Sequence, residues 1–120
     1  MEGSGMKKSL FILVILIFLP VSSVFAMTGG GYLKYCSSVD ANSAEFFRCG
    51  AYVIGVVDTM RASKAGNVAF KDVCFPEKTD EQQMIQMTLD WLNKNPKSLS
   101  SWAAFAVTMA MYENYKCGCK

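Results

Sequence analysis

The chain has 120 residues, a formal net charge of +2 and no histidine. This length fits one domain. Its 12 Lys and Arg are nearly balanced by 10 Asp and Glu, and no basic stripe is present, so the charges exclude a nucleic-acid-binding face and do not support attachment to anionic lipid. The lack of histidine excludes Ser-His-Asp triads, Cys-His dyads and the commonest metal ligand.

The N-terminus has the pattern of a secretory signal. Two lysines precede the apolar block LFILVILIFLPVSSVFA, and Val24 and Ala26 fit positions −3 and −1 of a cleavage site. The uninterrupted apolar run is shorter than the roughly 20 residues of a membrane span. We therefore predict that residues 1–26 are removed after export, residues 1–5 being an upstream start or an added extension. Residues 27–120 are then a single domain without membrane attachment.

All the cysteines lie in the predicted mature part. Small exported domains have a limited core and often add disulfides, each contributing about 2–4 kcal/mol. An odd number allows at most two intramolecular bridges. The five are Cys36, Cys49, Cys74, Cys117 and Cys119.

The first two predicted elements are a short helix and a long one. After the flexible entry MTGGG, which is expected to add no core residue, YLKYCSS (32–38) predicts the short helix. Asn42 and Glu45 are spaced as the N-cap and its partner of the long helix. Gly50 and Gly55 lie inside it, where we expect another element to pack closely. The valines would also suit a strand, but one helical face gathers Phe46, Cys49, Val53, Val56, Val57 and Met60.

Two further helices follow a connector. Thr79 and Gln82 form a capping box for the third predicted helix, which ends before Asn95-Pro96 because the residue before proline disfavours the α conformation. Its apolar face comprises Met84, Ile85, Thr88, Leu89 and Leu92. The last helix is expected to begin near residues 98–101 and to occupy the centre of the fold, with Trp102, Ala106 and Met109 on one face. The sequence therefore predicts an all-α bundle of three longer helices plus one short N-terminal helix.

This arrangement suggests how the cysteines pair. If the last two helices form a hairpin, Cys117 returns close to Cys74, while Cys36 and Cys49 flank a short break. We prefer the pairs Cys36–Cys49 and Cys74–Cys117, although the other connectivities stay open. Cys119 could replace Cys117, stay free or link two chains.

No catalytic or metal site is predicted. Cys117-Gly118-Cys119 lacks the two-residue spacing of a CxxC redox motif. The carboxylates have structural explanations at helix starts or beside lysine and arginine on their own helices. The residues thus favour a binding protein over an enzyme, with no metal and no cofactor.

Three blocks of the chain resemble, in order, the Tai (Rap/Tai) family of type VI secretion amidase immunity proteins. They are CGAYVIGVVDT (49–59), CFPEKTDEQQMIQMTLDWLNKNP (74–96) and AMYENYKC (110–117). The resemblance is greatest to the immunity partner of the fourth amidase class. The chain departs at its end, where Tyr115-Lys116-Cys117 replaces the usual Tyr-Pro-Cys, and this leaves the C-terminal disulfide partner open.

The resemblance implies a periplasmic protein, commonly a homodimer, that binds and blocks a peptidoglycan amidase of the papain-like Cys-His type. Such an inhibitor needs a preorganised segment that can enter or cover a cleft. Our candidates are Asn95, Lys97, Ser98, Leu99, Ser100 and Ser101, in which lysine would steer toward an acidic rim; the other interpretation of this segment is a plain helix connection. The alternative functions are a small periplasmic chaperone or envelope-stress protein and, third, a redox protein using Cys117 and Cys119.

Overall fold

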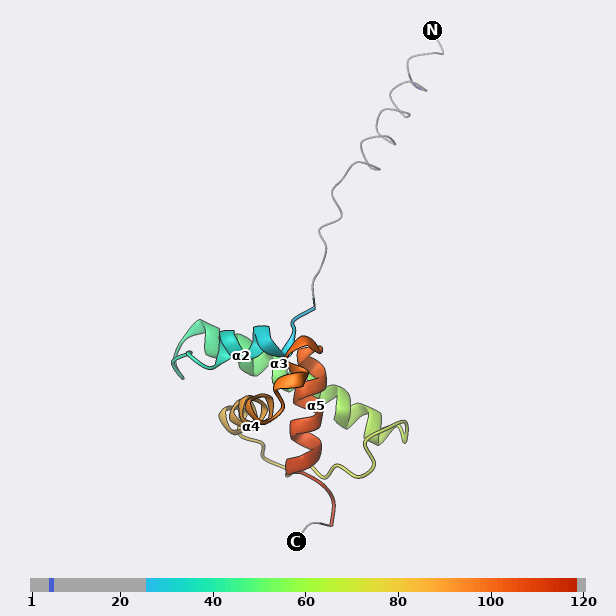
Figure 1. Cartoon of the computed structure of the whole chain (residues 1–120). Helices are drawn as coiled ribbons and strands as arrows, with labels where there is room; N and C mark the ends of the chain where they lie inside the picture. Colours follow the sequence, from blue (N-terminus) through green and yellow to red (C-terminus); the bar gives the residue numbers. More distant parts are fainter. Residues whose placement is uncertain (1–4, 6–25, 119–120) are drawn as a thin grey trace.

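The computed structural model describes residue 5 and residues 26–118. Within 26–118 the elements are α2 (Gly29–Cys36), α3 (Ala44–Ala65), α4 (Glu81–Lys94), the 3-10 helix η1 (Pro96–Ser100) and α5 (Ala103–Asn114). The same residues contain isolated β-bridges but no strand. The predicted fold class, three longer helices and a short N-terminal one, is confirmed (Figure 1). The predicted secretory signal lies almost wholly outside the described residues, among which no helix has the length and apolarity needed to cross a membrane.

Helix α5 is the centre of the bundle, as predicted. It contacts α2, α3 and α4, and its alanines allow the other helices to approach closely. Its buried residues are Ala103, Ala106, Val107, Ala110 and Met111. The predicted face was wrong at Trp102, which is 63% exposed because it precedes the helix in an extended conformation as its N-cap.

Helix α3 confirms the predicted helical face and excludes the strand alternative. Cys49, Val53, Val57 and Met60 are buried. Gly50 is a point of close packing, since a Cβ there would lie 1.4 Å from the Glu81 carboxylate at the start of α4. The same expectation for Gly55 is wrong, because a Cβ at that position would have nothing within 4 Å.

Helix α4 packs its predicted face into the core. Met84, Ile85, Thr88, Leu89 and Leu92 are all buried, and Trp91 joins them. The Thr88 hydroxyl donates to the Met84 carbonyl over 2.9 Å, which satisfies the one buried polar side chain of this face. The helix ends at Lys94, as the Asn95-Pro96 pair predicted.

The N-caps of α3 and α4 each lie one residue beyond the predicted position. Ser43, not Asn42, caps α3 by accepting from the backbone N–H of Phe46 over 3.2 Å. Asp80, not Thr79, caps α4 and accepts from the N–H of Gln82 over 3.0 Å. The Thr79 hydroxyl instead accepts a hydrogen bond from Arg61 over 3.4 Å, so it serves the contact between α3 and the connector.

The start of the last helix also differs from the prediction. Residues 96–100 form η1, and α5 begins only at Ala103 without a side-chain cap. Two backbone bonds explain why the serines do not start it. The Ser101 carbonyl accepts from the N–H of Gly29 over 2.8 Å, and the N–H of Ala103 donates to the Met27 carbonyl over 2.8 Å.

The glycine-rich entry is part of the core, contrary to the prediction. Thr28 caps α2, accepting from the N–H of Gly31 over 3.1 Å, and Gly29 is buried. A Cβ at Gly29 would lie 2.8 Å from Leu92 and 2.9 Å from the Ser98 carbonyl oxygen. Glycine is therefore required here for close packing between α2, α4 and η1.

Two disulfides join the pairs preferred from the sequence. Cys36–Cys49 links the end of α2 to α3 with a Cα–Cα distance of 6.0 Å, and Cys74–Cys117 links the connector to the segment after α5 at 5.0 Å. Both bonds close loops of the chain, which limits the unfolded ensemble. Cys119 lies outside the described residues.

Candidate partner-binding surface

The segment 95–101 is a short rigid turn rather than a long loop. The Asn95 side-chain amide donates to the Trp91 carbonyl over 2.8 Å, and Pro96 begins η1. On the other side, Leu99 and Ser98 lie against Gly29 and Gly30 of α2. The turn is thus fixed at both ends and along one side.

The six candidate residues divide by exposure. Lys97 and Ser100 are exposed, whereas Asn95, Ser98, Leu99 and Ser101 are half-buried. Within residues 26–118, the Lys97 ammonium makes no hydrogen bond or ion pair. The turn therefore presents a cation and a hydroxyl group on a fixed backbone.

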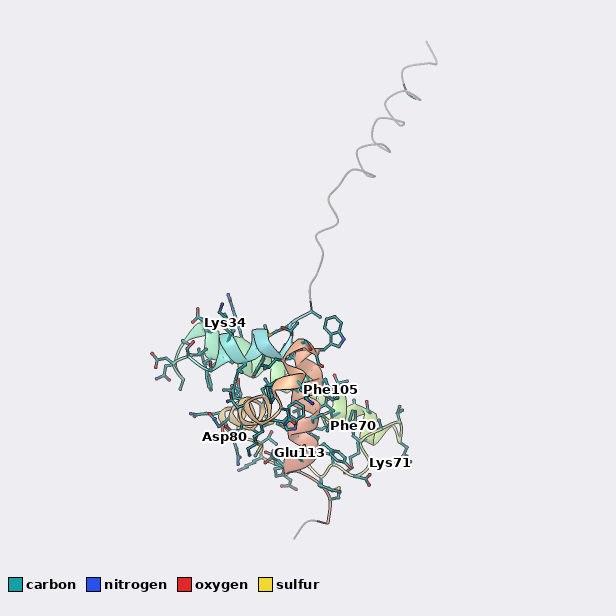
Figure 2. All side chains as sticks on the ribbon, viewed as in Figure 1. Lys34, Phe70, Lys71, Asp80, Phe105 and Glu113 are labelled. Carbon is teal, nitrogen blue, oxygen red and sulfur yellow. A yellow bond between two sulfur atoms is a disulfide. The ribbon has the colours of Figure 1, made fainter. Side chains whose placement is uncertain are left out.

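Two exposed aromatic side chains follow this turn. Trp102 is 63% exposed and Phe105, one helical turn later, is 47% exposed. The Phe105 ring, whose position is labelled in Figure 2, packs edge-on against the buried Trp91 with centroids 5.9 Å apart, so one side of it is supported by the core. Exposed aromatic groups on a rigid support are typical of the centre of protein interfaces. We call Lys97, Ser100, Trp102 and Phe105 the η1–α5 surface.

An open apolar groove runs between α3 and α5. Its volume is about 530 Å³, and none of its side chains carries a charge. Thr59, Gly55 and Thr108 are among the small residues that leave the space open, and the Thr59 hydroxyl donates to the Gly55 carbonyl over 2.9 Å. The complete lining is Ala51, Tyr52, Gly55, Val56, Thr59, Met60, Phe70, Ala104 and Thr108.

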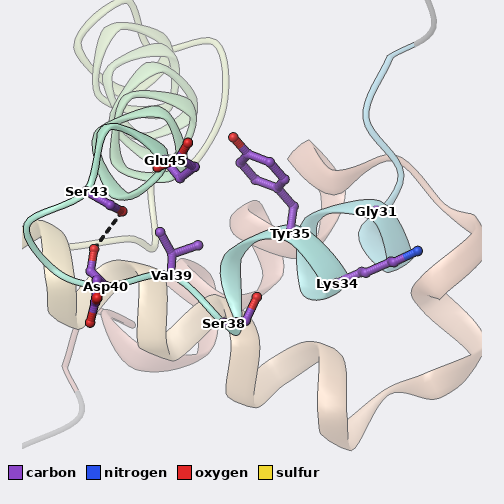
Figure 3. A pocket seen from close by; sticks show the side chains of 8 residues that line it. All are labelled: Gly31, Lys34, Tyr35, Ser38, Val39, Asp40, Ser43 and Glu45. Atoms are coloured by element: carbon purple, nitrogen blue, oxygen red, sulfur yellow. Dashed lines mark hydrogen bonds between the residues drawn. The ribbon is translucent and has the colours of Figure 1, made fainter.

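A second groove lies between α2 and the start of α3, and charged side chains are part of its lining. Figure 3 shows Tyr35 and Lys34 on α2, with Glu45 on α3 and Asp40 on the connecting turn. The Asp40 carbonyl accepts from the Ser43 hydroxyl over 2.8 Å and from the Ser43 N–H over 2.9 Å, and these two bonds hold the turn. The groove has a volume of about 580 Å³ and bears both signs of charge, and we assign it no ligand.

Several titratable groups of the described residues take part in contacts that hold the fold together. No group of three or more acidic or cysteine side chains there could hold a metal ion. Glu113 accepts from the Trp91 indole over 3.0 Å, and Asp58 lies 3.9 Å from Arg61. Burial, with smaller contributions from Tyr52 and Glu81, raises the pKa of Tyr32, whose hydroxyl donates to the Cys49 carbonyl over 3.4 Å. These are structural roles.

The turn at 95–101 is predictable from the sequence, whereas the exposed aromatic pair and the apolar groove were not predicted. The available signal was the last helix, AAFAVTMAMYEN, whose apolar residues are not confined to one face. A helix of this kind is normally covered on every side. In this chain one side of α5 instead borders the open groove, and its Phe105 side chain is exposed. Open apolar surface of this kind marks an interaction site.

The comparison with known families matches most of the described chain. The model of a family described as Rap1a immunity proteins matches residues 28–117. The match includes both disulfides, η1 and α5. No curated protein and no solved structure matches the chain.

Proposed function

The chain belongs to the family of Rap1a immunity proteins, and from that premise we propose that it protects the producing cell by binding and inhibiting a peptidoglycan amidase delivered by type VI secretion. It acts in the periplasm after cleavage of the signal at Ala26. It has no catalytic activity of its own, and it needs neither metal nor cofactor. The enzyme partner is a papain-like Cys-His hydrolase whose active-site cleft becomes covered.

The observation that carries this proposal is a rigid turn next to exposed aromatic groups. In the isolated chain Trp102 is 63% exposed, so most of its apolar ring stays in contact with water. Binding the amidase would bury it, and buried tryptophan is a frequent source of interface energy. Because η1 is already fixed against α2, little conformational entropy is lost when it binds.

Within the turn, we assign different roles to the exposed and half-buried residues. Lys97 and Ser100 contact the amidase, and the Lys97 cation favours association with an acidic cleft rim. Asn95, Ser98, Leu99 and Ser101 hold the turn in its shape through the contacts described above. Inhibition follows from steric exclusion of the cell-wall peptide, so no group in this chain must react.

The binding experiment is calorimetric titration of the mature protein with candidate amidases, together with an assay of peptide-stem hydrolysis. Trp102→Ala should weaken binding by about 2 kcal/mol, roughly 30-fold, as an interface hot spot does. Val68→Ala is the matched control, since it also truncates an exposed apolar side chain but lies on the connector. If wild-type protein binds and inhibits an amidase while Trp102→Ala retains full affinity, the η1–α5 surface is the wrong one.

The role of Lys97 is tested by comparing two charge reversals. Lys97→Glu should slow association, and the effect should decrease at high salt because an exposed charge acts mainly on the association rate. Lys71→Glu makes the same charge change on the exposed connector. An equal loss for both variants would show that only net charge matters, and the assignment of Lys97 would fail.

The apolar groove between α3 and α5 fits a second copy of this chain. A homodimer would cover the groove side of α5, which carries Ala104 and Thr108 and no charged group, without using the η1–α5 surface. Gly55→Phe would place a ring in the groove from α3, at a position where an added Cβ meets nothing within 4 Å. We expect a dimer mass for the wild type and a monomer mass for this variant by light scattering, with Gly55→Ala as the size control. A wild-type monomer, or a dimer unaffected by Gly55→Phe, would contradict this interface.

A further inference from the structure

The two disulfides differ strongly in accessibility. Cys36 and Cys49 are only 6% and 3% exposed. Cys74 is exposed and Cys117 is half-buried. A thiol in solution can therefore reach the second bond without opening the core, whereas the first bond is much less accessible.

A lysine ammonium group lies beside the accessible bond. Lys64, in the last turn of α3, has its Nζ 3.5 Å from the Cys74 sulfur and 3.8 Å from the Cys117 sulfur. The same ammonium donates to the Val73 carbonyl, which keeps it in place. A positive charge at this distance stabilises a thiolate, so either cysteine would be a better leaving group than an ordinary cysteine.

Backbone hydrogen bonds hold the two chain segments that carry Cys74 and Cys117 together. The N–H of Cys74 donates to the Tyr115 carbonyl and the N–H of Cys117 donates to the Asp72 carbonyl, each over 2.7 Å. Val73 and Lys116 form a β-bridge between them. These contacts do not depend on the sulfur–sulfur bond, so the two thiols would stay close after cleavage and could close again.

A hollow with a basic rim opens onto the exposed sulfur. Its volume is about 420 Å³, and it is lined by Arg61, Lys64, Ala65, Cys74 and Phe75. The Arg61 guanidinium lies 5.2 Å from the centre of the Phe75 ring. Asp58 is 3.9 Å from Arg61 and offsets part of its charge, but the lining itself holds two cations and no carboxylate. The hollow therefore suits a small thiol that carries carboxylates.

We propose that the Cys74–Cys117 bond is a thiol–disulfide exchange site for a small carboxylate-bearing thiol. The thiolate of this reagent attacks the Cys74 sulfur, the exposed one. A bond forms between the reagent and Cys74, the Cys74–Cys117 bond breaks, and the electron pair leaves on Cys117 as a thiolate beside the Lys64 ammonium. A second reagent thiolate then attacks the reagent sulfur of this mixed disulfide. The disulfide dimer of the reagent is released, and Cys74 leaves as a thiolate. This reactivity is separate from amidase binding.

Reduced glutathione is a suitable probe because it is a thiol with two carboxylates. The mature protein in a Cys119→Ser background, which removes the remaining cysteine, is mixed with glutathione, quenched with acid and mapped by mass spectrometry. We expect the first adduct on Cys74, with Cys36–Cys49 intact. An adduct first on Cys117, or loss of both disulfides at equal rates, would overturn the proposal.

Variants test the two cations. Lys64→Gln should slow exchange about fivefold, from the loss of one charge near 4 Å, whereas Lys34→Gln, which removes a charge from α2, should not. Arg61→Gln should reduce the preference for glutathione over 2-mercaptoethanol, compared at equal thiolate concentration, about two- to threefold. Far-UV circular dichroism checks that each variant is folded. Equal exchange rates for wild type and Lys64→Gln would refute the role of Lys64, and an unchanged thiol preference in Arg61→Gln would refute the carboxylate subsite.

Discussion

Gly29 lies where α2 packs against both η1 and α4, and Gly29→Ala perturbs these contacts. The added Cβ would lie 2.8 Å from Leu92 Cδ2 and 2.9 Å from the Ser98 carbonyl oxygen. A comfortable carbon contact is about 3.5–4.0 Å. Leu92 can adjust its side chain, but the Ser98 oxygen belongs to the backbone and moves only if η1 moves away from α2.

The expected loss of stability follows from these distances. Overpacking a well-filled contact costs about 1–3 kcal/mol. Alanine recovers little through helix propensity, because Gly29 is the first residue of α2 and propensity differences of about 1 kcal/mol apply to helix interiors. For a domain of this size each kcal/mol lowers the melting temperature by about 4–8 °C. We therefore expect a decrease of about 4–24 °C.

The assay is thermal unfolding by circular dichroism with both disulfides intact. Gly55→Ala is the control, since its Cβ meets nothing within 4 Å in the interior of α3; it should instead stabilise the protein by about 0.5–1 kcal/mol. Gly29→Ala should also weaken amidase binding, because η1 is displaced. If Gly29→Ala melts at or above the wild-type temperature, the close packing of α2 on η1 is not what positions the turn.

Three further results are expected. Ser43→Ala should cost about 1 kcal/mol of unfolding free energy while Asn42→Ala costs almost none, since Ser43 is the N-cap; equal costs in urea titrations would contradict this. Replacing Cys36 and Cys49 together by serine should destabilise the protein by about 2–5 kcal/mol, and a smaller change would assign the bond a minor role. Burial raises the pKa of Tyr32, so stability should fall as the pH rises above about 10, where the unfolded tyrosine ionises first. Tyr32→Phe should reduce that slope, and an unchanged slope would refute this cause.

Periodicity predicted the helices well where one apolar face is packed against the core. The third predicted helix is the clearest case: α4 buries Met84, Ile85, Thr88, Leu89 and Leu92 at helical spacing. The same reasoning located the break at Asn95-Pro96, since proline restricts the residue before it. These features depend on local chemistry, which the sequence states directly.

Other features depend on which distant residues meet, and the sequence does not show that. Asn42 and Ser43 are equally good caps, so only the observed turn decides between them. From the sequence, Gly29 is predicted to belong to a flexible N-terminal segment. Only the structure shows that Ser98 and Leu92 lie against it. The exposure of Trp102 was unexpected for the same reason, because the start of α5 is set by backbone bonds from residues 27–29.

The proposed function is tested most directly by measuring how the mature protein, at increasing concentration, inhibits a cognate type VI amidase. We predict stoichiometric loss of peptide-stem hydrolysis by wild-type protein, and a large rightward shift of the curve for Trp102→Ala but not for Val68→Ala. Full amidase activity in the presence of excess folded wild-type protein, for every amidase encoded alongside it, would contradict the proposed function.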